Sequence, residues 1–331
     1  MTDTSQHPIL ATHSGKFHAD EVFAYAVLRL ALGLHEPGVD HALLRTRSPG
    51  LIEAATIVWD VGSRYEADAN RFDHHQRGAP TRPDGTPFSS AGLVWQVYGA
   101  RAVAALLPPD VAQQFAPRIA ADIDHGLVRR IDEIDNGVAV DGRDSLNLAT
   151  LIGEFNPTWD DPASDGPTAG DAAFMEASRL AETVLRRRVD TMRSRLAAEA
   201  TVMAAHRSAE DPRLLVLDRG MPWKNVVHTH ELPVLLTVSP ASNGNWMLDT
   251  VPPEPGSFAQ KLPLPEAWAG LQADDLIKIT GVPDAVFVHL RRFVGAAGSR
   301  DGALAMARLA LADVAAPANR LAAYWQARHS S

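Results

Sequence analysis

Short apolar runs, each followed by a polar loop, recur through the first 60 residues of the chain. Each run has the length and composition of a buried strand. The runs are Ile9 to Thr12, Ala42 to Thr46 and Thr56 to Trp59. Apolar side chains at helical spacing predict helices from about Ala19, over Ser89–Leu107 and over Pro109–Ile131. Strands that alternate with helices predict an α/β fold built on a parallel sheet.

The pattern changes after residue 160. Residues 160–170 are rich in Asp, Pro and Gly, which favours a loop, and a long helix is predicted from about Asp171 to His206. The elements predicted beyond it are strands at Leu214–Leu217, Val234–Val238, Trp246–Val251 and Ala285–His289, a hairpin turn at Asn243-Gly244, and a helix over Gly302–Ala315. We therefore expect an α/β domain over residues 1–160, a loop and long connecting helix over residues 161–206, and a smaller α+β domain over residues 207–331.

The composition of the 331 residues is that of an ordinary water-soluble protein. Hydrophobic residues make up 46% and charged residues 21%, and charged side chains interrupt the longest apolar stretches. We therefore expect a cytoplasmic protein without a membrane span. The absence of cysteine excludes disulfides, Cys-ligated zinc and thiol nucleophiles. The formal net charge of −9 excludes a broad basic surface, so a polyanionic ligand would have to be bound by a local patch or by metal ions.

Side chains of the types that bind metals form four clusters in the first 140 residues. Each cluster lies near the end of a predicted strand or in a polar loop, and ligands of parallel sheets bind beyond the carboxyl ends of the strands. We expect one metal centre there, with nine candidate ligands: His13, His18, Asp20, Asp60, Asp73, His74, His75, Asp132 and Asp135. Glu21 lies beside Asp20, but the first turn of a helix favours an acidic residue for the helix dipole alone, and we interpret Glu21 in that way.

The number and type of these ligands indicate two divalent ions. A structural zinc site takes about four ligands, which argues against a non-enzymatic binding protein with a structural metal. Mixed imidazole and carboxylate ligands suit Mn²⁺, with Mg²⁺ or Zn²⁺ as alternatives. Two ions about 3.5–4 Å apart commonly serve phosphoester hydrolysis, because they activate water and neutralise phosphoryl charge.

Several motifs resemble those of a known enzyme family. The order His13-x4-His18-x-Asp20, Asp60, Asp73-His74-His75 and Asp132/Asp135 resembles the four-motif pattern of the DHH phosphoesterase superfamily. Within that superfamily, the chain is most similar to the MYG exonuclease family, also called metal-dependent protein hydrolases. The further motifs that carry the resemblance are Thr12 to Glu21, Ser89 to Val94, Ile134 to Gly137, Asn156 to Trp159, Pro222 to Lys224, Val251 to Phe258 and Leu262 to Trp268.

The resemblance implies roles for individual residues. The implied metal ligands are His13, His18, Asp20, Asp60, His74 and His75, and the residues to which it assigns catalysis are His74, His75, Asp60 and Asp20. Asp20 and Asp60 would be shared between the ions. Asp73 is either a further ligand or a partner that orients a histidine. For the last motif we prefer Asp135 as the ligand, since Asp132 is expected to face solvent on the preceding helix.

A second set of residues is predicted to bind the substrate. Phe293 to Arg300 occupies the position of a glycine-rich loop that holds the substrate in the family, although Ala297 stands where the family has a histidine. That difference removes one polar contact. An arginine in front of a helix can bind a phosphate. The candidate substrate-binding residues are Arg300, His289, Gly295 and Lys224.

The resemblance implies a DHH-type N-terminal domain and a divalent-metal-dependent phosphoesterase. The enzyme would be a 3′-to-5′ exonuclease that degrades RNA or short oligonucleotides by a two-metal mechanism. The alternative is hydrolysis of a small phosphate compound, such as pyrophosphate, a dinucleotide or phosphoadenosine phosphate, which the modest number of basic residues favours. The sequence leaves open which metal is bound, the direction of attack and whether the protein forms a homodimer.

Overall fold

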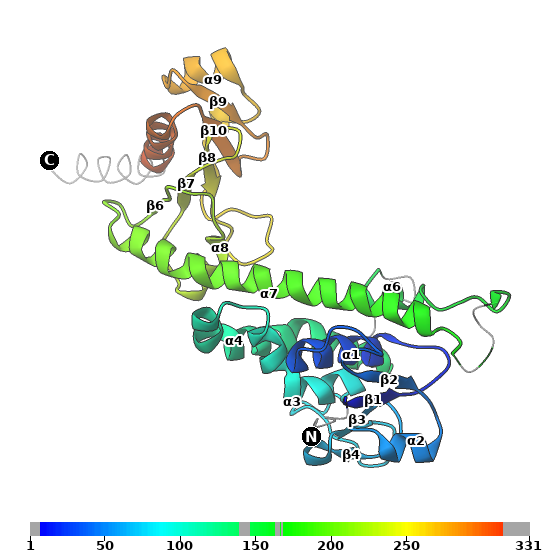
Figure 1. Ribbon diagram of the computed structural model, residues 1–331. Helices are drawn as coiled ribbons and strands as arrows, with labels where there is room; N and C mark the ends of the chain where they lie inside the picture. The colour runs from blue at the N-terminus through cyan, green and yellow to red at the C-terminus, as the bar shows by residue number, and fades with distance from the viewer. Residues whose placement is uncertain (1–6, 139–145, 163–165, 167, 314–331) are drawn as a thin grey trace, which may run out of the picture. The chain divides into compact units, whose positions relative to one another are not determined.

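The computed structural model describes residues 7–138, 146–162, 166 and 168–313. The chain divides into two compact units, residues 1–193 and 194–331, and the boundary falls inside the 37-residue helix α7 (Asp171–Arg207; Figure 1). Each unit combines helices with a five-stranded sheet, which confirms the mixed α/β class. The division at residues 160 and 206, with a separate connecting segment, stays a prediction. Within the described ranges, none of the helices has the length and apolar character needed to cross a bilayer.

The sheet of the first unit is parallel except at one edge. Its strand order is β2-β1-β3-β5-β4, and only β4 and β5 pair in antiparallel orientation. The strands are β1 (Ile9–Thr12), β2 (Ala42–Arg45), β3 (Ile57–Trp59), β4 (Tyr65–Glu66) and β5 (Arg71–Phe72). The first three confirm the predicted strands. The other two have no counterpart among the predicted strands, because two residues carry no periodic signal.

The central helix of this unit is α1 (Ala19–Leu32). Its side chains are buried on nearly all sides, and most of them are apolar. The helix ends at Gly33, which adopts a left-handed φ of 66°. It packs against α3 (Ser90–Ala104; Figure 1). The rings of Phe23 and Trp95 lie 6.0 Å apart in that contact. The start of α1 is thereby fixed next to the carboxyl ends of the strands.

The predicted helix over Pro109–Ile131 is interrupted. α4 (Pro109–Ile123) ends in a π-helical turn, Asp124–Val128, before the chain continues as α5 (Arg129–Asp135). The Asp124 carboxylate accepts two hydrogen bonds of 2.9 Å from Arg82, so a contact distant in sequence stabilises the turn. The remaining helical segments of this unit are α2 (Pro49–Ala54), η1 (Ala67–Ala69) and α6 (Leu148–Gly153).

The second unit contains a mixed sheet with the strand order β6-β7-β8-β10-β9. Only β6 and β7 are parallel. Its elements are β6 (Leu214–Val216), α8 (Lys224–Thr229), β7 (Leu236–Pro240), β8 (Trp246–Thr250), η4 (Glu266–Trp268), α9 (Ala273–Thr280), β9 (Ala285–Val288), β10 (Val294–Ala297) and a helix over residues 300–313. The predicted hairpin is confirmed, since β7 and β8 pair around Asn243 and Gly244.

Two predictions for the second unit need correction or completion. Part of the expected glycine-rich loop is the strand β10, because Gly295 lets it pack closely against β9: a Cβ at this position would lie 3.0 Å from the carbonyl oxygen of Phe287. The predicted helix over Gly302–Ala315 begins at residue 300, and its last two residues lie outside the described residues.

Gly92 on α3 offers a test of the packing between α3 and α5. A Cβ there would lie 2.5 Å from Oδ1 of the buried Asp132 and 2.6 Å from the ring of Phe88. We expect Gly92→Ala to lower the free energy of unfolding by about 1–3 kcal/mol through overpacking. The matched control is Gly50→Ala in α2, where a Cβ meets no atom within 4 Å. This substitution should raise the free energy of unfolding by up to about 1 kcal/mol. Equal urea midpoints for the two variants would contradict this packing.

Candidate metal centre

Three neighbouring parallel strands deliver the first residues of the site. His13 follows β1, Asp60 follows β3, and Asp73 and His74 follow β5. Asp60 adopts a left-handed φ of 55°, a conformation that costs a non-glycine residue about 1–2 kcal/mol. Such strained residues are typical of functional sites, because the surrounding structure must hold them in place. The carboxyl edge of the sheet therefore gathers the candidate ligands as the predicted topology requires.

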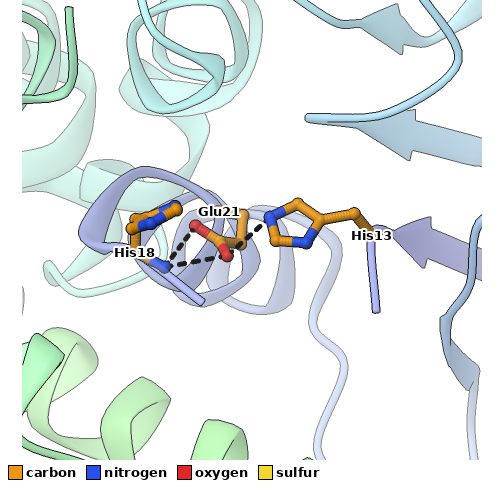
Figure 2. Close-up of side chains that lie close together, drawn as sticks. All are labelled: His13, His18 and Glu21. Atoms are coloured by element: carbon orange, nitrogen blue, oxygen red, sulfur yellow. Dashed lines mark hydrogen bonds and ion pairs between the residues drawn. The ribbon is translucent and has the colours of Figure 1, made fainter. Parts of the chain in front are cut away.

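Glu21 lies inside the cluster, although the sequence favoured a role at the helix dipole alone. It is fully buried, and its carboxylate accepts hydrogen bonds of 2.9 and 3.0 Å from the backbone N–H of His18, which caps α1. The same carboxylate lies 2.9 Å from Nε2 of His13. Figure 2 shows the carboxyl group of Glu21 between the His18 backbone and the His13 ring. The dipole interpretation of Glu21 was thus incomplete, because a helix cap can also face the site.

Asp60 lies at the centre of the cluster. Its carboxylate contacts Nε2 of His13 and Nε2 of His74, both at 3.2 Å. The same nitrogen of His74 lies 3.4 Å from Oδ2 of Asp135 and 3.9 Å from Oδ2 of Asp20. Five residues from four segments of the chain thus share one small volume.

Asp73 and His75 form a separate pair at the edge of the cluster. Oδ1 of Asp73 lies 2.7 Å from Nδ1 of His75, and its Oδ2 accepts a 2.5 Å hydrogen bond from the backbone N–H of Ser63. Both carboxylate oxygens therefore have protein partners, which favours the orienting role for Asp73. The ring of His75 is 59% exposed, and its Nδ1 lies 3.7 Å from Asp60.

Asp132 does not face solvent, so that prediction was wrong. Its side chain is fully buried and accepts hydrogen bonds from the backbone and hydroxyl of Ser89 at 2.9 and 2.7 Å and from Nε of Arg82 at 2.7 Å. A helix pattern cannot reveal such a partner, since Arg82 lies 50 residues away. Asp135, one turn further along α5, is the carboxylate that reaches His74.

Two residues that support the cluster lie within the sequence motifs, but no role was predicted for either of them. The hydroxyl of Ser90 donates a 2.7 Å hydrogen bond to Oδ2 of Asp20. The side-chain amide of Asn156 accepts from the backbone N–H of Phe17 at 2.9 Å and donates to its carbonyl at 2.8 Å. Asn156 thereby fixes the loop between His13 and His18. The family-like motifs around Ser90 and Asn156 were the signal that could have identified them.

The donor atoms fit divalent cations. Four groups of three side chains bring ligand atoms within 4.8 Å of one another: His13 with His18 and Glu21; Asp60 with His74 and His75; His18 with Asp20 and Asp135; and Asp20 with Glu21 and Asp60. Oδ1 of Asp20 is buried and has no hydrogen-bond partner, a costly state that a cation would relieve. Four carboxylates packed together also call for positive charge.

The pKa values of these groups reflect the same crowding of negative charge. Burial acts to lower the pKa of His13, but hydrogen bonds to Asp60 and Glu21 raise it to about 10. Burial likewise opposes protonation of His74, yet Asp60, Asp20 and Asp135 raise its pKa to about 9. Burial also acts to raise the pKa of Asp60, but the two histidines lower it to about 2. Burial and the charge of Asp20 raise the pKa of Asp135 to about 8.

The cluster lines a cleft of about 1250 Å³ in the first unit. Apolar side chains form part of its wall, among them Phe17, Ile131 and Ile134. Lys16 and Arg47 also line it. The cleft makes the candidate ligands accessible to a ligand larger than an ion.

The four predicted substrate-binding residues belong to the second unit. His289 is exposed at the turn that enters β10, while Arg300 is exposed beyond the other end of that strand, with Nε 4.0 Å from Asp218. Gly295 is buried within β10, and Lys224 begins α8 beside the ring of Trp223. The structure does not gather these residues around one point of this unit, since His289 and Arg300 lie at opposite ends of β10.

Comparisons with known proteins place this sequence among named relatives. A family profile, MYG1_exonuc, described as "Uncharacterised protein family (UPF0160)", matches residues 9–311. The MYG1 exonuclease of Homo sapiens is 33% identical over 92% of this chain and 86% of that protein, and the MYG1 exonuclease of Bos taurus is 34% identical over 94% and 86%. The MYG1 protein C27H6.8 of Caenorhabditis elegans is 33% identical over 92% and 95%. No solved structure is significantly similar to the chain.

Asp132 and Asp135 should respond differently to the same substitution. Asp132→Asn removes the charge that pairs with buried Arg82 and should lower the free energy of unfolding of the metal-free protein by about 3 kcal/mol. Asp135→Asn resembles the protonated carboxyl group, so it should leave metal-free stability nearly unchanged while reducing the stabilisation that Mn²⁺ provides. Thermal unfolding with and without Mn²⁺ measures both effects, and the reverse assignment would exchange the two results.

Metal binding should release protons at neutral pH. With pKa values of about 10 and 9, His13 and His74 are protonated in the metal-free protein at pH 7, and a cation must displace those protons. The apparent association constant should therefore rise between pH 6 and 9, by about tenfold per pH unit for each proton released. Titration calorimetry in two buffers of different ionisation enthalpy counts the protons. Affinity that is flat over this range would contradict the protonated cluster.

Proposed function

Because this chain belongs to the MYG1 exonuclease family, we propose that it is a divalent-metal-dependent phosphodiesterase that degrades RNA or short oligonucleotides from the 3′ end. The observation that carries the proposal is the cluster of carboxylates and imidazoles around Asp60, which opens into a large cleft. The unpartnered oxygen of Asp20 supports a cation at the same place.

The residues divide into two overlapping ligand sets. Asp60 belongs to one group with His74 and His75 and to another with Asp20 and Glu21, and Asp20 and Glu21 each belong to a second group as well. Of these three carboxylates, we assign Asp60 and Asp20 as the ones that two ions would share. His13, His18 and Asp135 complete the sets. The imidazole content favours Mn²⁺, with Mg²⁺ or Zn²⁺ as alternatives. Bound as a pair, such ions lower the pKa of water and neutralise charge on the phosphoryl oxygens.

The side chains around the ligands orient them and form part of the cleft wall. Asp73 accepts from Nδ1 of His75, which assigns the ring proton to that atom and leaves the lone pair of Nε2 for a ligand. Ser90 donates to Oδ2 of Asp20, so Oδ1, which has no hydrogen-bond partner, would be available to a cation. Phe17, Ile131 and Ile134 give the cleft an apolar wall beside the cluster, and a less polar surrounding strengthens electrostatic interactions.

The size of the cleft supports an oligonucleotide over pyrophosphate. Sites for small molecules typically enclose about 300–1,000 Å³, and this cleft exceeds that range at about 1250 Å³. The assignment of further substrate contacts to Arg300, His289, Gly295 and Lys224 in the second unit belongs to the same proposal.

A 5′-labelled RNA oligomer tests the activity and its direction together. We expect metal-stripped protein to be inactive and Mn²⁺ to restore a ladder of progressively shorter labelled products, as removal from the 3′ end requires. Asp60→Asn should reduce the rate at least about 100-fold, because it weakens both ligand sets. Lys278→Ala, exposed on α9, is the control and should leave the rate unchanged.

Other outcomes would identify the alternatives. Immediate release of the labelled 5′ nucleotide would reverse the direction of attack. Turnover of pyrophosphate, a dinucleotide or phosphoadenosine phosphate without turnover of the oligomer would favour a hydrolase of small phosphate compounds. A protein that binds Mn²⁺ and turns over none of these substrates would be a binding protein, and the proposed function would be wrong.

A further inference from the structure

Two basic side chains line the cleft of the metal centre without an acidic partner. Lys16 and Arg47 are both exposed on its wall, and neither forms an ion pair with any of the described residues. Glu53 also lines the cleft, and among the described residues it forms no ion pair with either cation. Both cations therefore face the cleft with their charge available to an anionic ligand.

Arg47 is anchored to the loop that carries His13. Its Nε donates a 3.3 Å hydrogen bond to the carbonyl oxygen of Ser14, the same oxygen that lies 3.2 Å from Nδ1 of His13. This anchor uses only Nε, so the two terminal nitrogens of the guanidinium can bind an anion in the fork geometry that suits phosphate.

Lys16 is positioned by the same loop, which is held from both sides. Arg45 donates a hydrogen bond to the carbonyl oxygen of Gly15, and Asn156 binds the backbone of Phe17. Arg45 itself is buried and paired with Asp171, so it is not available to a ligand. The loop is therefore fixed on either side of Lys16, and the flexible lysine side chain extends from a rigid backbone.

We propose that Lys16 and Arg47 form a phosphate subsite beside the metal centre. This inference rests on the proposed function: when the scissile phosphodiester lies at the metal ligands, the two cations bind the next phosphodiester on its 5′ side. The subsite selects nucleic-acid chains with at least two phosphates over esters with a single phosphate, and it thereby favours oligonucleotides over dinucleotides.

A comparison of ApA, which has one phosphate, with ApApA, which has two, tests the subsite. We expect the wild-type protein to prefer ApApA in kcat/KM by about 10- to 100-fold, as hydrogen bonds to charged groups allow. The Lys16→Ala, Arg47→Ala double variant should lose that preference while its turnover of ApA stays within about twofold of wild type. Arg47→Lys keeps the charge but not the fork, so it should give an intermediate preference. Arg101→Ala, exposed on α3 outside the cleft, is the control for loss of one charge.

Several results would overturn the subsite. An equal loss of ApA and ApApA turnover in the double variant would mean that the cations act at the scissile phosphate or through the general field of the cleft. An unchanged preference would mean that they do not contact the substrate. Equilibrium binding of both oligomers to protein loaded with Ca²⁺ gives the same comparison without turnover. A protein that binds ApApA more tightly through these cations but cleaves neither oligomer would refute the proposed function and leave the subsite standing.

Discussion

The structure of the first unit depends on the burial of several carboxylates next to one another. Asp20, Glu21 and Asp60 are almost completely removed from solvent, and Asp135 reaches the same volume. Charged groups at such distances repel one another unless positive charge is present. In the metal-free state that charge comes from protons on His13 and His74. The proposed metal centre would therefore exchange these protons for cations when metal ions bind.

Much of this arrangement follows from local sequence. The three buried strands, the helix after His18 and the polar segments at the strand ends were predictable from apolar runs and spacing. Strands of two residues, β4 and β5, were not, because β5 depends on pairing with β3, and β4 on pairing with β5, rather than on their own composition. The strand β10 was missed for another reason: the family resemblance placed a glycine-rich loop there, while Gly295 serves close packing against the backbone of Phe287.

The residues that hold the site together were harder to predict than the residues that form it. The burial of Asp132 depends on Arg82 and Ser89, which lie 50 and 43 residues away. Gly92 leaves space for that carboxylate on the adjacent helix. A single sequence does not reveal such pairs, since each partner reads as an ordinary polar or small residue of its own segment. Candidate ligands other than Glu21, by contrast, could be identified from their residue type.

The contact between Asn156 and the backbone of Phe17 shows that the residues that support the site extend further along the chain than the candidate ligands do. Every candidate ligand lies before residue 136, yet the amide that fixes their first loop comes from Asn156, and Arg45 is paired with Asp171 at the start of α7. A fragment cut after α5 would contain all the ligands but lack both supports. A fragment that keeps both supports must therefore extend into α7, and gene fragments or domain fusions that stop earlier would carry the ligands without these contacts.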